Sequence, residues 1–287
     1  LQPYIYYNFI LFFKYLGFIN PFQWIFIIKL ISSFFGLSSI IYLFFTFKNN
    51  FFKKNNHFNF FIFFSFWFYP FLHSRTSSEN LSITLFIFSF CFLYKQLESK
   101  EMKFNYFLLF IASFIMGLSM VTKFNMIFTT IPFFIWMAIF YFNIYRLTFF
   151  SISILLALSF GLLIDYINWG TFKNTYYQFY YYNLDSKFGR LNDYGEQPWW
   201  YFVFETAIQL APILSFIFII GIIVYWVKNP KNSITWITFM TILFISIFKH
   251  KEIRYIFPVY IFAPLFVAYF FEIFNIRYLT KILKFVV

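Results

Sequence analysis

Five ionisable residues lie within six consecutive positions in the segment 249–254, which reads Lys-His-Lys-Glu-Ile-Arg between two apolar stretches. A phosphate group that leaves in a reaction needs positive charge and hydrogen-bond donors, and His250, Lys251 and Arg254 could supply both. Glu252 could hold one of these side chains through an ion pair. The alternative is an ordinary hydrated turn that ends two helices, since a charge at the centre of a bilayer costs about 2.5–3.5 kcal/mol. Mixed charge and a histidine in one tight turn favour a functional site over an ordinary hydrated turn.

An aromatic segment at residues 194–202 is a second candidate. Gly195 and Pro198 predict a turn there, and Trp199 and Tyr201 lead from it into the next apolar stretch, while Tyr194 precedes it. Such rings could form a platform for a sugar ring or for the start of a prenyl chain, because both present apolar faces. The competing interpretation is the belt of aromatic residues that marks a membrane interface.

Three further ionisable residues stand apart from these segments. Arg75 and Lys123 each lie in a short turn between apolar stretches, where a helix end with an exposed cation competes with a functional role. Asp165 has apolar or aromatic neighbours on both sides. An ionisable group so flanked is a functional candidate, and an acid at a helix end near the interface explains it equally well.

The elements that must position these residues are apolar stretches. Of the 287 residues, 62% are hydrophobic and only 11% are charged, too few polar groups to coat a soluble protein. The sequence therefore predicts an all-α polytopic transmembrane helical bundle, a single membrane domain over residues 1–287 with about nine spans. The stretches run approximately Phe22–Phe47, Phe58–Leu72, Leu81–Tyr94, Phe104–Val121, Met126–Phe142, Leu147–Ile167, Tyr201–Val227, Ile234–Phe248 and Tyr255–Phe274.

Residues 1–20 predict an N-terminal interfacial helix. The stretch Pro3–Leu16 is apolar but only about four helical turns long, and Lys14, Gly17 and Pro21 mark its end. The chain opens with Leu1 instead of Met, which indicates a fragment whose start is absent.

The loops between the stretches fall into two alternating sets that differ in charge. One set carries twelve Lys and Arg residues against three acids, and the other carries nine against seven. The positive-inside rule places the first set in the cytoplasm. The second set holds the segment 249–254, both isolated cations and the long segment 168–200, so we expect the chemistry on the lumenal or periplasmic face.

Several classes of site are excluded by the residues themselves. Cys91 is the one cysteine, and the three histidines fall in different loops, so neither a disulfide framework nor a metal site is expected, and no cofactor is predicted. The chain has no glycine-rich phosphate loop and no Gly-x-Ser-x-Gly motif. The net charge of +12 is distributed over short loops, which predicts a lipid bilayer and not nucleic acid as the partner.

Four separated groups of residues, taken in order, resemble motifs of glycosyltransferase family 22, the membrane mannosyltransferases of GT-C type that include enzymes of GPI-anchor synthesis. The run from His250 to Pro258 is the most specific of the four, and order and spacing agree across nearly the whole chain. The groups are Arg75-Thr76 with Asn80; Leu163-Ile164-Asp165 with Trp169-Gly170; Asn183 with Tyr194-Gly195, Pro198-Trp199 and Tyr201-Phe202; and His250-Lys251-Glu252 with Arg254-Tyr255 and Pro258.

The resemblance implies a mannose donor carried on polyprenyl or dolichyl phosphate, a glycolipid acceptor, and inversion at the sugar carbon. An aspartate base would deprotonate the acceptor while cations stabilise the departing phosphate. On this basis the phosphate-side candidates are His250, Lys251, Arg254, Arg75 and Lys123, and the orienting candidates are Glu252 and Asp165. The substrate-binding candidates are Asn183, Tyr194, Gly195, Pro198, Trp199 and Tyr201.

The chain departs from the family pattern at three places. Gln197 and Trp200 stand where the family often has histidines, and Lys123 stands where it usually has the arginine of an Arg-Pro-Thr turn, which loses the guanidinium fork. The family's acidic catalytic residues lie in a lumenal loop that would precede Leu1, so the catalytic base is expected outside this sequence.

Two other functions stay open at this point. A polytopic lipid or sugar transporter or flippase would place charges along a path, but the chain shows no paired halves, and its polar residues gather on one face. A catalytically degenerate relative would have lost its base. The expected location is a multi-pass position in the ER membrane of a eukaryote or the inner membrane of a bacterium.

Overall fold

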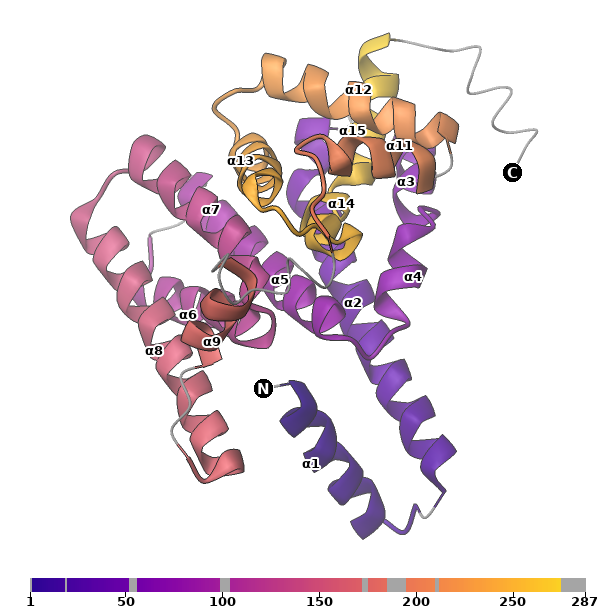
Figure 1. Cartoon of the computed structure of the whole chain (residues 1–287). Helices are drawn as coiled ribbons and strands as arrows, with labels where there is room; N and C mark the ends of the chain where they lie inside the picture. The colour runs from indigo at the N-terminus through magenta and orange to yellow at the C-terminus, as the bar shows by residue number, and fades with distance from the viewer. Residues whose placement is uncertain are drawn as a thin grey trace.

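The structure is a computed structural model that describes residues 2–18, 20–51, 56–98, 104–171, 175–184, 195–209 and 212–274. Within these ranges the chain is helical and contains no β-strand, which confirms the predicted all-α class (Figure 1). The helices are α1 (Gln2–Tyr15), α2 (Pro21–Phe51), α3 (Asn56–Phe64), α4 (Phe68–His73), α5 (Ser78–Glu98), α6 (Tyr106–Thr122), η1 (Phe124–Met126), α7 (Ile127–Phe140), α8 (Ile144–Trp169), α9 (Thr175–Leu184), α11 (Tyr201–Gln209), α12 (Pro212–Lys228), α13 (Ser233–Ile247), η2 (Ile253–Ile256), α14 (Phe257–Tyr260) and α15 (Ala263–Phe274).

Each predicted apolar stretch coincides with one helix or with consecutive helices. Three described helices, α2, α5 and α8, are long and apolar enough to cross a membrane, and the pair Ile253–Tyr260 and Ala263–Phe274, bent by 55°, would make a fourth. The other apolar helices are shorter, at 10–17 residues. The structure thus supports three to four candidate spans, and the larger count of nine stays a prediction.

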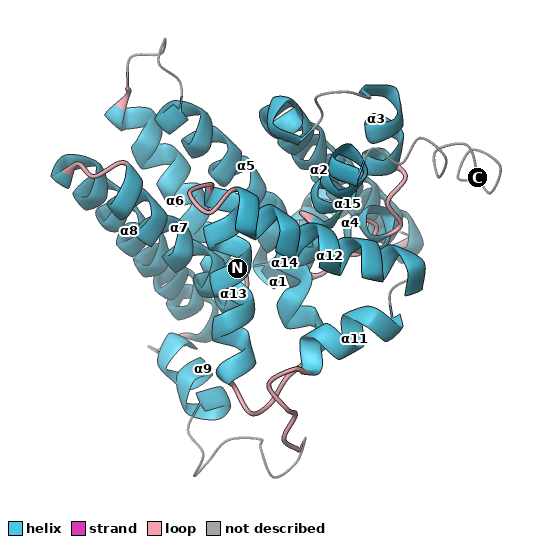
Figure 2. Cartoon of the chain, turned by 90° about the horizontal axis from the view of Figure 1, so that it is seen from above, coloured by secondary structure: helices cyan, strands magenta, loops and turns pink. Residues whose placement is uncertain are grey.

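The figures show two groups of helices with α13 and α14 between them (Figures 1 and 2). One group contains α6, α7 and α8, and the other contains α2, α3, α12 and α15. Glycines allow neighbouring helices to approach each other closely within each group. A Cβ atom on Gly117 of α6 would lie 2.5 Å from the Cβ atom of Ala157 in α8, and one on Gly221 of α12 would lie 2.4 Å from the main-chain oxygen of Phe266 in α15.

The bend between α14 and α15 lies in the buried centre of the protein. Pro264 lacks the N–H group that would continue the helical ladder back to the turn before it. The carbonyl of Ile261, at the bend, accepts a hydrogen bond of 3.0 Å from the buried hydroxyl of Tyr69 in α4. Because a buried carbonyl without a partner is costly, this bond stabilises the bend, which directs η2 toward one end of the bundle.

Hydrogen bonds between segments far apart in the sequence show which segments lie at the same end of the bundle. At one end, Gln2 donates to the carbonyl of Thr76 at 2.7 Å, and the amide of Gln197 donates to the carbonyl of Lys249 at 2.9 Å. At the other end, the Trp136 indole donates to the carbonyl of Lys231 at 2.8 Å. The contact between Gln197 and Lys249 joins two loops that the sequence predicts on the same side of the membrane, while Gln2 lies in α1 and Trp136 lies in α7. The alternating layout stays a prediction.

The predicted N-terminal helix is present as α1, which runs antiparallel to the first half of α2 (Figure 1). The hydroxyls of Tyr6 and Ser32 lie 3.3 Å apart, and the Lys14 ammonium lies 5.1 Å from the centre of the Trp24 ring. Its place at a membrane interface stays a prediction.

The close approach at Gly221 predicts a defined loss of stability. The substitution Gly221→Ala places a methyl group against the Phe266 carbonyl, and we expect it to cost about 1–3 kcal/mol because the two helices must separate. Thermal unfolding of the purified protein in detergent measures this. The substitution Ser38→Ala on the exposed side of α2 is the control, with an expected change within about 0.5 kcal/mol. Equal melting temperatures for the two variants would contradict the packing argument.

The orientation predicts which loops an impermeant thiol reagent reaches. In a Cys91→Ser background, Lys228→Cys should react only from the cytoplasmic side of sealed vesicles and Lys249→Cys only from the opposite side, because α13 separates the two positions. Both lysines are exposed, so accessibility does not limit the reaction. Labelling of both cysteines from the same side would overturn the layout.

Candidate functional site

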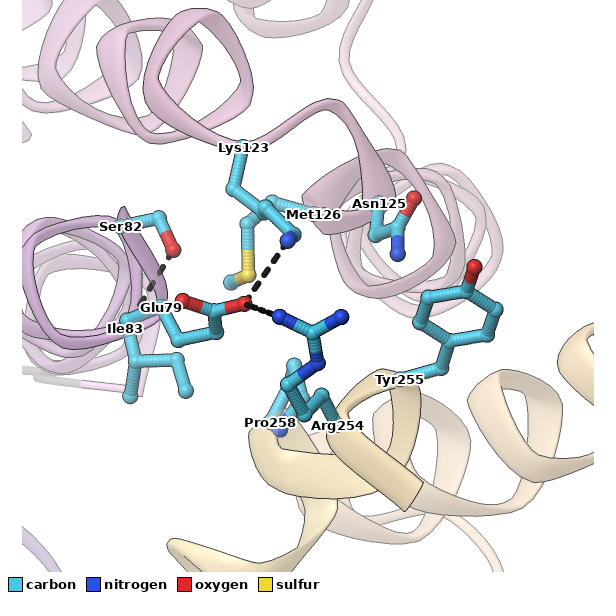
Figure 3. A pocket seen from close by; sticks show the side chains of 9 residues that line it. All are labelled: Glu79, Ser82, Ile83, Lys123, Asn125, Met126, Arg254, Tyr255 and Pro258. Atoms are coloured by element: carbon cyan, nitrogen blue, oxygen red, sulfur yellow. Dashed lines mark hydrogen bonds and ion pairs between the residues drawn. The ribbon is translucent and has the colours of Figure 1, made fainter. Parts of the chain in front are cut away.

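A carboxylate and two cations from three separate elements meet at one end of the bundle (Figure 3). The Oε1 atom of Glu79 lies 2.8 Å from the Lys123 ammonium nitrogen and 3.7 Å from a guanidinium nitrogen of Arg254. Lys123 and Arg254 are sequence-predicted phosphate candidates, and the structure brings them together. Glu79 joins them although it was not among the predicted site residues.

Helix ends place these three side chains. Glu79 lies in the first turn of α5, whose start is capped where the amide of Asn80 donates to the Ser77 hydroxyl at 3.2 Å. Lys123 ends α6 with an extended backbone, at φ −147° and ψ 107°. Arg254 lies in η2, the short helix that leads into the bend before α15. Each charge thus occupies a chain break, where an apolar helix gives way to a turn.

Arg254 is also held by Glu252. Its Nε–H group donates to the Oε2 atom of Glu252 at 2.9 Å, and a terminal NH₂ group donates to the same oxygen. The His250 Nε2 atom lies 3.4 Å from the other carboxylate oxygen of Glu252. Burial raises the pKa of Glu252, but the hydrogen bonds from Arg254 and His250 outweigh burial and hold this pKa below its usual value. Glu252 thus holds Arg254 by an ion pair, and its predicted orienting role stays a prediction.

Lys251 points to main-chain oxygens instead. Its side chain is buried, with 5% of the residue exposed, and its ammonium group donates to the carbonyl of Gln197 at 2.9 Å and also to that of Phe248. Burial lowers the pKa of Lys251, an effect that the charge of Glu196 partly opposes. Glu196 forms an exposed ion pair with Lys249 at 2.7 Å. The contacts of Lys251 and Lys249 thus hold residues 195–198 against the turn before η2.

Arg75 lies apart from the two clustered cations. Its guanidinium carbon is 3.8 Å from the centre of the Phe71 ring, and its carbonyl accepts a 2.8 Å hydrogen bond from the side chain of Asn80. The Oδ1 atom of Asn80 also accepts a hydrogen bond of 2.7 Å from Nδ1 of the buried His73 ring. A Cβ atom on Gly36 of α2 would lie 2.1 Å from this ring, so only glycine fits there. The Arg75 turn is therefore held by the residues around it.

Asp165 holds α9 against α8. Its carboxylate accepts a hydrogen bond of 3.0 Å from the hydroxyl of Thr175. The next residue, Tyr176, donates to the carbonyl of Leu158 at 3.0 Å and stacks on Phe124, with ring centres 5.4 Å apart. Phe124 directly follows Lys123 in the chain. The contacts of Asp165 are thus with α9, and α9 in turn contacts the residue that follows Lys123.

The aromatic segment is described only in part. Gly195 has a φ of 74°, a left-handed conformation that favours glycine, as its predicted turn requires. Trp199 is 74% exposed just before α11, and Tyr201 is half-buried in the first turn of α11. Tyr194 and the side chain of Asn183 lie outside the described residues.

A small open pocket adjoins the ion pairs (Figure 3). Its lining residues are Glu79, Ser82, Ile83, Lys123, Asn125, Met126, Arg254, Tyr255 and Pro258. The lining combines two cations with the carboxylate of Glu79 and with amide and hydroxyl groups, and the two cations could bind an anion with several oxygens. In the described part of the chain no three His, Cys, Asp or Glu residues are grouped so as to hold a metal ion.

Sequence reasoning missed Glu79 because an acid in a helix's first turn has a local explanation, the favourable charge at the start of a helix. A usable signal was present nonetheless. Glu79 lies in a turn between two apolar stretches, on the same predicted side as Lys123 and Arg254. A buried acid at that end requires a cation from another loop.

Comparison with known proteins assigns the chain to a family. The Alg9-like mannosyltransferase family matches over residues 1–287. The chain belongs to this family. Among curated proteins, the human GPI alpha-1,2-mannosyltransferase 3 is 33% identical over 115 residues, which are 39% of this chain and 20% of the human protein. The chain thus aligns with about one-fifth of that relative. No solved structure matches. The family assignment confirms the resemblance found in the four motifs.

The contacts of Lys251 predict a stability effect larger than that of its neighbour. The substitution Lys251→Met leaves two partly buried carbonyl groups without this donor, and we expect a loss of about 1–3 kcal/mol together with faster proteolysis within the 195–200 segment. The substitution Lys249→Met removes an exposed ion pair and should cost about 0–1 kcal/mol. Thermal unfolding and limited proteolysis of both variants make the comparison, and equal behaviour would show that Lys251 does not fasten the segment.

Proposed function

We propose that the protein transfers mannose from a polyprenyl- or dolichyl-phosphate donor to a glycolipid acceptor at the end of the bundle that carries Lys123 and Arg254. The observation that carries the proposal is the pairing of these two cations beside a pocket in a chain of a mannosyltransferase family. The human relative's name, a GPI mannosyltransferase, supports a glycolipid acceptor.

In the proposed reaction the two cations act on the phosphate as it leaves. The bond between the sugar carbon and the phosphate oxygen breaks, and negative charge grows on that oxygen. Arg254, oriented by Glu252, offers further N–H groups from a side chain that is 54% exposed. Lys123 offers a second positive charge. Because these donors are already in place, little reorganisation accompanies the reaction.

The acceptor would lie toward the 195–201 segment. Exposed Trp199 offers an apolar face for a sugar ring or a prenyl chain, and Lys251 keeps this segment next to the turn that bears Arg254. We assign the carboxylates of Glu79 and Glu252 to cation binding and not to proton abstraction from the acceptor, because both are ion-paired. The base is expected in the loop that the family resemblance places before Leu1.

The proposed location is the ER membrane, with the site on the lumenal face. The loop charges and the human relative support it. A transporter is less well supported, because the ion pairs described above lie at one end of the bundle and not along a path through its middle.

Loss of either cation should lower turnover far more than stability. For Lys123→Met and Arg254→Met in the full-length protein, we expect the mannosyl transfer rate to fall by roughly 10²–10³, the scale of a single preorganised donor. The donor KM should change less, since these groups act mainly in the transition state. A radiolabelled-mannose assay with purified protein measures both.

The matched control is Lys231→Met, which removes a cation at the opposite end of the bundle. Each variant is compared by thermal unfolding, because a misassembled protein would also be inactive. If Lys123→Met and Arg254→Met are both well folded and retain turnover within about threefold of wild type, a small effect on this scale, the phosphate site lies elsewhere.

A further inference from the structure

Glu79 performs no bond-making or proton-transfer step in the reaction proposed above, yet it contacts both cations at once. We propose that Glu79 is an internal anion that holds Lys123 and Arg254 in the absence of substrate, and that the phosphate of the lipid-linked donor displaces its carboxylate from both side chains. This inference rests on the proposed function and adds that the Glu79 carboxylate and the donor phosphate compete for the same two cations.

The geometry places one oxygen atom where a phosphate oxygen would bind. Both cations contact the same atom, Oε1 of Glu79, at 2.8 Å and 3.7 Å, and Figure 3 shows this oxygen between the two positive side chains. A phosphate oxygen bridging the two side chains would take the same position. The carboxylate and the phosphate therefore exclude each other at this point.

The charges of the cluster favour the same conclusion. Glu79 and Glu252 balance Lys123 and Arg254, so these four side chains carry no net charge. An entering anion gains little Coulomb energy from a neutral cluster and gains more when one carboxylate withdraws. Withdrawal of Glu79 leaves Lys123 without this carboxylate and removes one of the two acidic neighbours of Arg254, whereas withdrawal of Glu252 affects Arg254 and not Lys123.

Glu79 is also the more easily displaced partner of Arg254. Two N–H groups of Arg254 donate to Glu252, whereas its contact with Glu79 is a single approach of 3.7 Å. The Glu79 side chain is only 10% exposed, so it needs a polar partner after it is displaced. The Ser78 hydroxyl, 3.3 Å from Oε2, and the first turn of α5, where negative charge is favoured, provide one.

The test measures binding of geranylgeranyl phosphate, a short polyprenyl phosphate, to the full-length protein in nanodiscs. Removing the internal anion by Glu79→Gln should tighten this binding by about three- to tenfold, the scale of a partly buried ion pair. Glu79→Asp, whose shorter side chain cannot keep the 2.8 Å contact unchanged, should tighten binding by a smaller factor. This second variant keeps the test informative if Glu79→Gln does not fold.

Two controls isolate the phosphate. Geranylgeraniol has the same chain without the phosphate, so its affinity should be equal in wild type and Glu79→Gln. Glu98→Gln removes the acid at the opposite end of α5, where Glu98 accepts a hydrogen bond from Tyr141, and should leave phosphate binding unchanged. A gain for geranylgeraniol equal to the gain for the phosphate would overturn the inference.

The outcomes also separate this inference from the proposed function. Unchanged or weaker phosphate binding in the Glu79 variants, with weaker binding in Lys123→Met and Arg254→Met, shows that Glu79 only orders the cations and that the inference is wrong. Unchanged phosphate binding in Lys123→Met and Arg254→Met contradicts the displacement proposed here, whereas the proposed function fails only if these variants also keep their turnover.

Discussion

A charged side chain that is removed from water at the end of an apolar helical bundle needs an opposite charge or a main-chain carbonyl as its partner, because an unpaired charge away from water is costly. Glu79 is the partner of Lys123 and also contacts Arg254. These contacts join the start of α5, the end of α6 and η2. The pocket exists because these three chain breaks lie together. The arrangement of the helices thus depends on the pairing of charges as well as on apolar packing.

The packing of the apolar helices in turn places the breaks. Gly221 allows α12 to approach the main chain of α15, and the hydroxyl of Tyr69 satisfies the carbonyl at the bend before α15. The bend directs η2, and with it Arg254, toward α5. In a bilayer, where apolar surface gives little preference between one helix neighbour and another, close contacts and internal hydrogen bonds of this kind decide which helices associate.

Three cations in or beside one motif have different roles for physical reasons. Lys251 is buried and donates to carbonyls, so it fastens the aromatic segment. Arg254 is half exposed beside the pocket, and its planar fork lets it donate to Glu252 and approach Glu79 at the same time. Lys249 is exposed and paired with Glu196. This segment therefore contains both a buried structural cation and a cation that is open to solvent beside the pocket.

The sequence by itself determined the all-α class, the position of each apolar helix and the mannosyltransferase family, because these depend on composition, on the length of apolar runs and on local motifs. It also identified Lys123, Arg254 and Glu252. Only the tertiary structure decided that Glu79 joins the two cations, that Lys251 points to the carbonyl of Gln197, and that Arg75 stacks on Phe71. These partners are separated by up to 175 positions in the chain, as Glu79 is from Arg254. Neither spacing nor composition encodes which loops of an apolar bundle meet, since that choice is made by packing among helices whose surfaces are chemically alike.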